Sequence, residues 1–468
     1  MPEWEPVIGL EIHVQLKTNT KMFCGCEAGF GGEPNTRTCP VCLAFPGALP
    51  VPNQTAVEWT IKLGHALNCR IAERAVFHRK NYFYPDNPKG YQISQYDEPL
   101  CIDGSFVVPG PDGDGEVGIV RAHLEEDAAK TIHVGGATGR IVGSAHSNVD
   151  FNRGGTPLVE IVTQPDLRSA DEAKRFLQLL RQPIVELGIS DAEMEKGTLR
   201  ADANVSVREV GETGYRTRTE LKNMNSFNHI ARGIEAELRR QIETWESGGT
   251  VVQETLDYEV KSDTVTPRRR KEEADDYRYF PEPDLVPLEP EADVVERLRS
   301  EVPELPSKRI HELTDVVGFE SALDLVATGN ERKARMLVDN GLDWSTAANV
   351  AMNQLSSIEP LPENGAALVA VIKQRERITH EAYDASFASS ATTVIAVDEV
   401  LAQVAISDAG ELEPLVERIL ADSPGQVVAY KGGKEGLLGF FVGQVMKETQ
   451  GKADPKVVNE LLRSKLSA

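Results

Sequence analysis

Four cysteines lie close together near the start of the chain, in two pairs. Cys24 and Cys26 are separated by one residue, and Cys39 and Cys42 are separated by two. Two close thiol pairs joined by a loop suit a tetrahedral zinc site, although one residue is a shorter gap than usual. Four protein ligands leave no open coordination position, so such an ion stabilises the fold. We expect structural zinc at these residues; the alternative is four free thiols buried in a core.

Acids and one histidine form a second group of candidate ligands, and they stand in strand-like runs. In GLEIHVQL, apolar and polar residues alternate, which places Glu11 and His13 on one face of a strand. HLEED contains Glu125 and Glu126, and PLVEIV surrounds Glu160 with apolar residues, where an unpaired carboxylate is costly. Carboxylates suit magnesium, especially when substrate phosphates complete its coordination. We predict a magnesium site here; the alternative is that each acid forms its own ion pair.

Cations, amides and aromatic rings are interleaved in three further segments. RKNYFYPDNPKGYQ combines positive charge with tyrosines, a mixture that holds single-stranded nucleic acid by charge and stacking. NRGG and RADAN add polar side chains next to glycines or on one face of a strand. Each segment alone is typical of a surface loop, but together they favour a large open active surface. The candidate nucleotide-binding residues are Lys80, Asn81, Tyr82, Asn152, Arg153, Arg200, Asp202 and Asn204.

Length, charge and missing motifs narrow the class of protein. The chain has 468 residues, enough for two to four domains, and a formal net charge of −23 that argues against general adhesion to nucleic acid. It contains no apolar run that could span a bilayer and no signal peptide, so we expect a soluble, cytoplasmic protein. It also lacks a P-loop, a dinucleotide-binding glycine motif and a nucleophile elbow. ATP, if used, is therefore bound in another way.

The texture of the sequence changes twice along the chain. Residues 1–293 combine short alternating runs, turn residues and helical patterns at 56–68 and 170–188, which indicates a mixed α+β domain built on an antiparallel sheet. GPDGDGE looks like a calcium loop but lacks its full spacing, so we expect a hairpin tip. Residues 294–395 are predicted to form an all-helical domain, and residues 396–468 a small helical tail domain.

The tail reverses the sign of the charge. Residues 431–468 contain seven Lys or Arg and four acids, a local balance of +3 in an acidic protein. A charged helix face is often merely solvated, but this reversal also fits contacts with RNA phosphates. The candidate nucleic-acid contacts are Lys431, Lys434, Lys447, Lys452, Lys456, Arg463 and Lys465.

Several long motifs occur in the order found in one enzyme family. GLEIHVQLKT, PNTRTCPVCLAFPGALPVPN, HLEEDAAK, VDFNRGGTPLVEIVTQPDLRS, MEKGTLRADANVSVR and DDYRYFPEPDLVP resemble the B subunit of aspartyl/glutamyl-tRNA(Asn/Gln) amidotransferase, as does the closing GFFVGQVMKETQGKADPKVVNELL. The resemblance implies a cradle-shaped N-terminal domain. It also implies ATP-dependent phosphorylation of the side-chain carboxylate of Glu-tRNA(Gln) or Asp-tRNA(Asn), both misacylated. Ammonia, released from glutamine by the A subunit, then gives Gln-tRNA(Gln) or Asn-tRNA(Asn), and a small C subunit completes a heterotrimer.

The family also implies roles for the residues singled out above. Glu11, His13, Glu160 and one of Glu125 and Glu126 would lie in a magnesium-dependent kinase site, and the cysteines would form a zinc knob that many members have. The sequence departs from the family pattern at Ala129, usually glycine, at Ala201, often cysteine, and at 378–393, which is acidic where a lysine-bearing segment is usual. Two alternatives are a zinc-containing RNA-binding protein without catalysis and the archaeal paralogue with an inserted domain.

Overall fold

The chain divides into two compact units, Met1–Glu312 and Leu313–Ala468. The computed structural model describes residues 3–135, 143–269, 277–375, 380–392, 406, 408–449 and 452–467. The first unit extends beyond the expected boundary after residue 293, because helix α4 (Ala292–Ser300) packs on helix α1 (Gln54–Ala66). His65 Nε2 lies 3.1 Å from the carbonyl oxygen of Val295 across this contact. The expected boundary at 395/396 lies outside the described residues.

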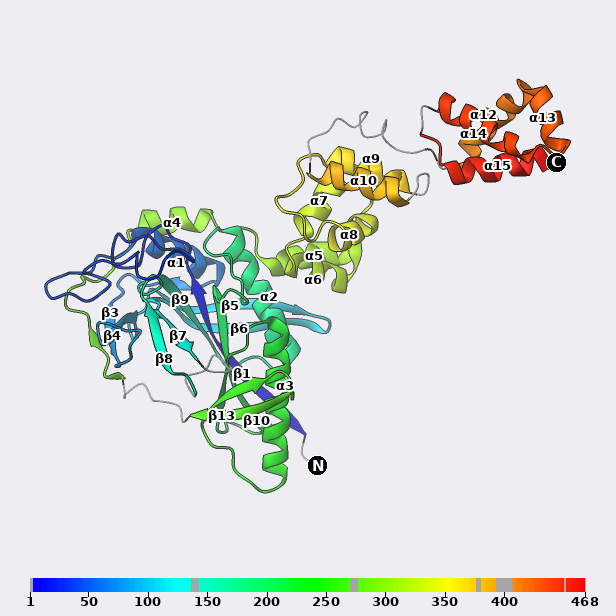
Figure 1. Cartoon of the computed structure of the whole chain (residues 1–468). Helices are drawn as coiled ribbons and strands as arrows, with labels where there is room; N and C mark the ends of the chain where they lie inside the picture. The colour runs from blue at the N-terminus through cyan, green and yellow to red at the C-terminus, as the bar shows by residue number, and fades with distance from the viewer. Residues whose placement is uncertain are drawn as a thin grey trace. The chain divides into compact units, whose positions relative to one another are not determined.

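The first unit is built on one large sheet (Figure 1). Within the described residues, twelve strands form this sheet, in the order β13-β12-β11-β10-β1-β9-β6-β4-β3-β14, with β5 pairing with β6 and β2 with β5; β7 and β8 pair separately. The neighbouring strands are antiparallel except for β11 and β12. The predicted α+β class is therefore confirmed. The strands are β1 (Trp4–Gln15), β2 (Arg70–Ile71), β3 (Phe77–Asn81), β4 (Tyr91–Gln95), β5 (Cys101–Gly110), β6 (Gly113–Glu126), β7 (Lys130–Val134), β8 (His146–Asp150), β9 (Pro157–Thr163), β10 (Leu199–Glu209), β11 (Thr219–Lys222), β12 (Thr255–Glu259), β13 (Thr264–Arg269) and β14 (Phe280–Pro281).

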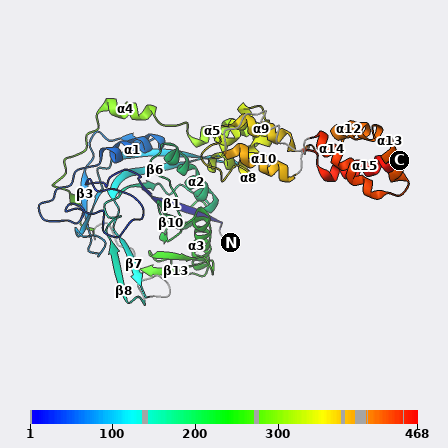
Figure 2. The ribbon, with the colours of Figure 1, turned by 45° about the horizontal axis from the view of Figure 1, so that its top comes forward.

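The central strand β1 follows the predicted alternation. Leu10, Ile12 and Val14 are at most 1% exposed, whereas Glu11 and His13 point to the opposite, partly open face. Helices α1, α2 (Ala170–Glu186) and α3 (Phe227–Glu246) pack against strands of the sheet and lie along one side of it in Figure 2. The apolar face of the sheet is thus covered, and the polar face of β1 is left for ligands.

Two local predictions can be compared with the structure. Strands β5 and β6 pair as far as Gly110 and Gly113, so GPDGDGE forms a hairpin tip, as expected. Ser169 caps helix α2 by accepting a hydrogen bond from the backbone N–H of Glu172. The helix predicted at 56–68 begins two residues earlier, because Asn53 supplies the N-terminal cap of α1.

The second unit is helical, and its described residues contain two separate hydrophobic clusters. One is formed between Leu325 and Ala391 and the other between Leu412 and Leu466. The acidic segment that departs from the family pattern contributes α10. Among the helices of the described residues, none has the length and apolar character needed to cross a bilayer. The helices are α5 (Pro306–Val317), which spans the unit boundary, α6 (Phe319–Ala327), α7 (Glu331–Asp339), α8 (Trp344–Asn353), α9 (Gly365–Lys373), α10 (His380–Thr392), α12 (Ala409–Ala421), α13 (Pro424–Lys431), α14 (Leu438–Glu448) and α15 (Pro455–Ser467).

Candidate functional site

A row of charged side chains crosses four neighbouring strands on the polar face of the sheet. His13 of β1 pairs in register with Arg200 of β10 on one side and with Glu160 of β9 on the other. Glu160 in turn pairs with His123 of β6. Directly opposite residues share a face, and adjacent strands are about 4.8 Å apart. Sheet register therefore brings together side chains that are far apart in the sequence.

Three of the predicted ligands converge within this row. His13 Nε2 lies 3.4 Å from Glu160 Oε2 and 3.5 Å from Glu125 Oε1. One ligand atom from each residue lies within 4.8 Å of the other two. Glu125 is almost fully buried, at 3% exposure. Two carboxylates and an imidazole in this arrangement form a donor set suited to a divalent cation.

The protonation of the three groups reflects their proximity. Burial disfavours the charged form of His13, but its hydrogen bond to Glu160 and the charges of Glu160 and Glu125 outweigh burial and raise the pKa of His13 to about 9. Burial, together with the charge of Glu160, raises the pKa of Glu125. Burial also opposes the charge of Glu160, but His123 and His13 hold the pKa of that carboxyl below its usual range. A protonated His13 thus occupies the position between the acids that a cation would share.

The other two predicted magnesium ligands have different surroundings. Glu11 lies on the same face, where its Oε1 accepts a hydrogen bond of 3.0 Å from Asn204 Nδ2. Glu126 follows Glu125 in β6 and therefore points to the opposite face. There it forms an ion pair with Lys89 and accepts a hydrogen bond of 3.0 Å from the backbone N–H of Ile93. The structure thus brings Glu125, and not Glu126, to the cluster.

A cavity of about 580 Å³ opens over the cluster. Its wall includes five predicted residues, which are Glu11, His13, Lys80, Glu160 and Asp202. Further cations and a group of tyrosines complete the wall, although the sequence analysis did not single them out. These additional residues are Tyr96, Arg121, His123, Arg218, Glu220, Lys222, Tyr277 and Tyr279.

The wall combines positive charge with stacked rings. Tyr96 and Tyr279 stack with centroids 4.1 Å apart, and Lys80 Nζ lies 4.9 Å from the ring centroid of Tyr277. Lys222 forms an ion pair with Asp202, and burial of Lys222 is outweighed by the nearby acids, which raise its pKa. Such a wall can hold a polyanion next to a metal ion.

His123 is a member of the site that sequence reasoning missed. Arg121 Nε donates to His123 Nδ1 at 3.3 Å, so the imidazole proton resides on Nε2, which lies 3.7 Å from Glu160 Oε2. His123 is thereby oriented toward one of the candidate metal ligands. The signal was present in the sequence, because His123 precedes Glu125 by two residues in a strand and must share its face.

Several predicted nucleotide-binding residues make internal contacts instead. Asn81 Nδ2 donates to the carbonyl oxygen of Arg278 at 2.8 Å, and the ring of Tyr82 lies edge-on to Tyr277. Asn152 bonds to the loop that carries the cysteines, through the backbone N–H of Arg37 and the carbonyl of Glu33. Arg153 and Arg200 both pair with Asp127. Within the described part of the chain, these contacts brace the segments around the cavity.

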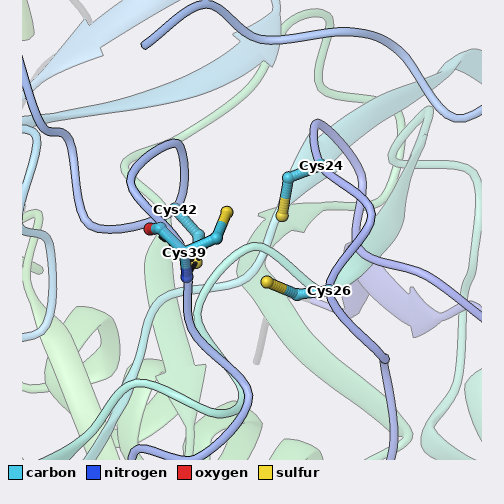
Figure 3. Close-up of side chains that lie close together, drawn as sticks. All are labelled: Cys24, Cys26, Cys39 and Cys42. Atoms are coloured by element: carbon cyan, nitrogen blue, oxygen red, sulfur yellow. Dashed lines mark hydrogen bonds between the residues drawn. The ribbon is translucent and has the colours of Figure 1, made fainter.

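The four cysteines converge from two turns of one loop, as Figure 3 shows. Their Sγ atoms all lie within 4.8 Å of one another. Cys42 Sγ accepts a hydrogen bond of 3.1 Å from the backbone N–H of Cys39. A hydrogen bond from Cys24 is the main cause that lowers the pKa of Cys42 to about 4, and the charge of Lys21 contributes. The geometry and the thiolate character fit a tetrahedral metal ion.

The basic residues of the tail lie in or next to helices α13, α14 and α15. Lys465 forms ion pairs with Glu413 and Glu417, so part of the tail's positive charge is neutralised internally. Lys452 and Lys465 are partly buried, and the five other members are exposed. The exposed members are Lys431, Lys434, Lys447, Lys456 and Arg463.

Comparison with known proteins covers the same two units. The GatB/GatE catalytic domain family matches residues 6–296, and the GatB domain family matches residues 320–466. The chain is 46% identical over 485 residues to the B subunit of aspartyl/glutamyl-tRNA(Asn/Gln) amidotransferase from Syntrophotalea carbinolica, with 99% of each chain covered. The B subunit from Geobacter sulfurreducens is 46% identical over 480 residues, with 99% of each chain covered. That from Persephonella marina is 43% identical, with 99% of this chain and all of the relative covered.

These matches agree with the motif order read from the sequence and with a polar sheet face that gathers acids, histidines and cations. Their coverage of both the sheet unit and the helical unit excludes a relationship through a single shared domain. The chain belongs to the family formed by the B subunits of aspartyl/glutamyl-tRNA(Asn/Gln) amidotransferase.

Proposed function

We propose that this chain carries out the ATP-dependent step of tRNA-dependent amidation. Its substrate is the misacylated Glu-tRNA(Gln), Asp-tRNA(Asn) or both, and its products are Gln-tRNA(Gln) and Asn-tRNA(Asn). The observation that carries the proposal is the cluster of His13, Glu125 and Glu160 beneath a cavity walled by cations. Membership of the family supplies the reaction class, and the cavity supplies a place for its chemistry.

The reaction proceeds in two balanced steps. A side-chain carboxylate oxygen of the esterified amino acid attacks the γ-phosphorus of ATP, the bond to the bridging oxygen breaks, and ADP leaves. Ammonia then attacks the carbonyl carbon of the acyl phosphate, inorganic phosphate leaves, and the nitrogen loses a proton to give the amide. Lys80, Arg121 and Arg218 line the cavity and are placed to neutralise phosphate charge.

Magnesium fits the donor set beneath the cavity. His13, Glu125 and Glu160 would hold it, and Glu11 on the cavity wall would contribute an oxygen nearby. When bound, the ion neutralises charge on the transferred phosphoryl group. The chain's own residues orient the carboxylates, while the buried position of Glu125 keeps its oxygen from being screened by water.

The remaining assignments concern structure and assembly. Zinc at Cys24, Cys26, Cys39 and Cys42 would stabilise the loop between β1 and α1. The exposed basic residues of the tail would contact tRNA phosphates. Because the relatives are named as one lettered component of an amidotransferase, partner chains are implied. We assign these to a glutaminase, the A subunit, and to a small C subunit in a heterotrimer.

Formation of ADP by the purified heterotrimeric complex tests the proposed kinase step. Glu125→Gln and His13→Ala should lower Glu-tRNA(Gln)-dependent, magnesium-dependent ADP formation roughly a hundredfold or more, because loss of a ligand removes several kcal/mol of stabilisation. Glutamine hydrolysis, measured separately, should persist. Glu73→Gln, at an exposed carboxylate away from the cavity wall, serves as the matched control. Wild-type ADP formation in both cluster variants would show that the chain binds tRNA without catalysing this step.

A further inference from the structure

A second cavity, of about 440 Å³, lies on the same face of the sheet. It borders the first cavity, and both are lined by Glu11, Arg121 and Arg218. The two cavities therefore form one continuous bipartite site with a boundary of charged side chains. The proposed chemistry uses the first cavity and leaves the second without a role.

Sheet register shows how the two cavities differ. The row through His13 is charged on all four strands, as described above. In the next row toward the N-terminus of β1, Glu11 lies between Asp202 and Val162, and Val162 pairs with Arg121. The following rows pair Gly9 with Asn204 and Val7 with Ser206. The face thus changes from charged to neutral over successive rows.

The neutral half combines flat apolar surface with hydrogen-bonding groups. Val162 and Pro165 give apolar surface, and Gln164 and Ser206 give an amide and a hydroxyl. Tyr215 at the rim is 69% exposed and offers a ring for stacking. A nucleobase and a ribose need this combination, because each has a flat or apolar body and a polar edge. A metal ion or a free phosphate would instead require the charged half.

We propose that the second cavity binds the nucleoside end of the nucleoside triphosphate, and that the triphosphate crosses Arg121 and Arg218 to reach the cluster at His13. This inference rests on the proposed kinase function. The dimensions suit it, because Gly9 and His13 are four residues apart along β1, a separation of about 13 Å. The volume of about 440 Å³ is within the range of small-molecule sites.

Gly9 provides a direct test of occupancy. By strand alternation a Cβ at this position points to the same face as Glu11, toward the second cavity. Its nearest neighbour would be Pro165 Cα at 3.5 Å, an ordinary van der Waals contact. Gly9→Ala should therefore fold normally while narrowing the space for a nucleoside by one methyl group.

Steady-state kinetics of the heterotrimeric complex decide the proposal. Gly9→Ala should raise KM for ATP about tenfold, the smaller end of the effect of one methyl group in a fitted pocket, and leave kcat and KM for Glu-tRNA(Gln) within twofold. Tyr215→Ala, at an exposed position, should raise KM for ATP in the same way. Gly425→Ala adds a methyl group at a glycine with open space around it and should change neither constant.

Two results would overturn the proposal. A rise in KM for Glu-tRNA(Gln) with unchanged KM for ATP would show that the 3′-terminal nucleoside of tRNA occupies the cavity. Unchanged constants in both Gly9→Ala and Tyr215→Ala, with normal thermal unfolding, would show that neither nucleoside binds there. In either case, loss of ADP formation in Glu125→Gln would leave the proposed function intact. If the wild-type complex formed no ADP, the proposed function itself would fail.

Discussion

At the scale of single residues, the site depends on which face of a strand each side chain occupies. Glu125 and Glu126 are adjacent acids, yet one lies in the cluster and the other pairs with Lys89 on the opposite face. Alternation along β6 accounts for the difference. The same alternation places His123 beside the cluster, where its Nε2–H faces Glu160.

His123 should act by positioning Glu160. His123→Leu should weaken the apparent magnesium affinity of the heterotrimeric complex by roughly 10- to 100-fold, the usual effect of removing a group that orients a metal ligand. His123→Gln can still donate a hydrogen bond and should recover much of the affinity. The measurement is ADP formation against magnesium concentration. Equal losses in both variants, or no change in His123→Leu, would refute the positioning role.

At the scale of elements, local patterns were predictable and strand pairing was not. The alternation in GLEIHVQL predicted both the buried face of β1 and the shared face of Glu11 and His13. However, β9 lies between β1 and β6 in the sheet, and this order decides that Glu160 meets both His13 and His123. Because these contacts join residues up to about 150 positions apart in the sequence, local spacing could not reveal them. The second cavity was missed for the same reason.

The cysteine loop is an element whose order we expect to depend on metal. Residues 28–53 between β1 and α1 form no helix or strand, so a bound ion would replace missing backbone pairing. We predict one zinc per chain by elemental analysis. Cys39→Ser should lose zinc and make the loop sensitive to trypsin at Arg37.

The matched control for this prediction is Cys69→Ser, at a buried cysteine outside the loop, which should retain zinc. Zinc-free wild-type protein with four titratable thiols would contradict the assignment. Retained tRNA-dependent ADP formation at a reduced level in Cys39→Ser would agree with a structural role, because the cysteines do not line the cavity over the cluster.

At the scale of the whole molecule, charge is unevenly distributed. The chain carries −23 overall, while residues 431–468 carry +3. The tail also has its own hydrophobic cluster, between Leu412 and Leu466. Its removal should therefore leave the core of the first unit intact, and an acidic remainder should bind a polyanion poorly.

Deletion of residues 408–468 should weaken tRNA binding by the heterotrimeric complex much more than it slows the chemistry on bound tRNA. Each phosphate contact that is lost should flatten the dependence of log affinity on log salt concentration by roughly 0.7–0.9. Binding isotherms at several salt concentrations measure both quantities.

Single substitutions separate exposed charge from charge that is already paired. Lys431→Ala and Lys456→Ala remove exposed cations and should each reduce the salt slope. Lys465→Ala should have a smaller effect, because Lys465 is held by Glu413 and Glu417, and these acids raise its pKa. If the truncated complex kept both the wild-type dissociation constant and the wild-type slope, the basic face would be a solvated surface. A slope that changed equally for all three lysines would instead mean that the tRNA displaces the internal ion pairs, since phosphate oxygens can replace carboxylates around an ammonium group.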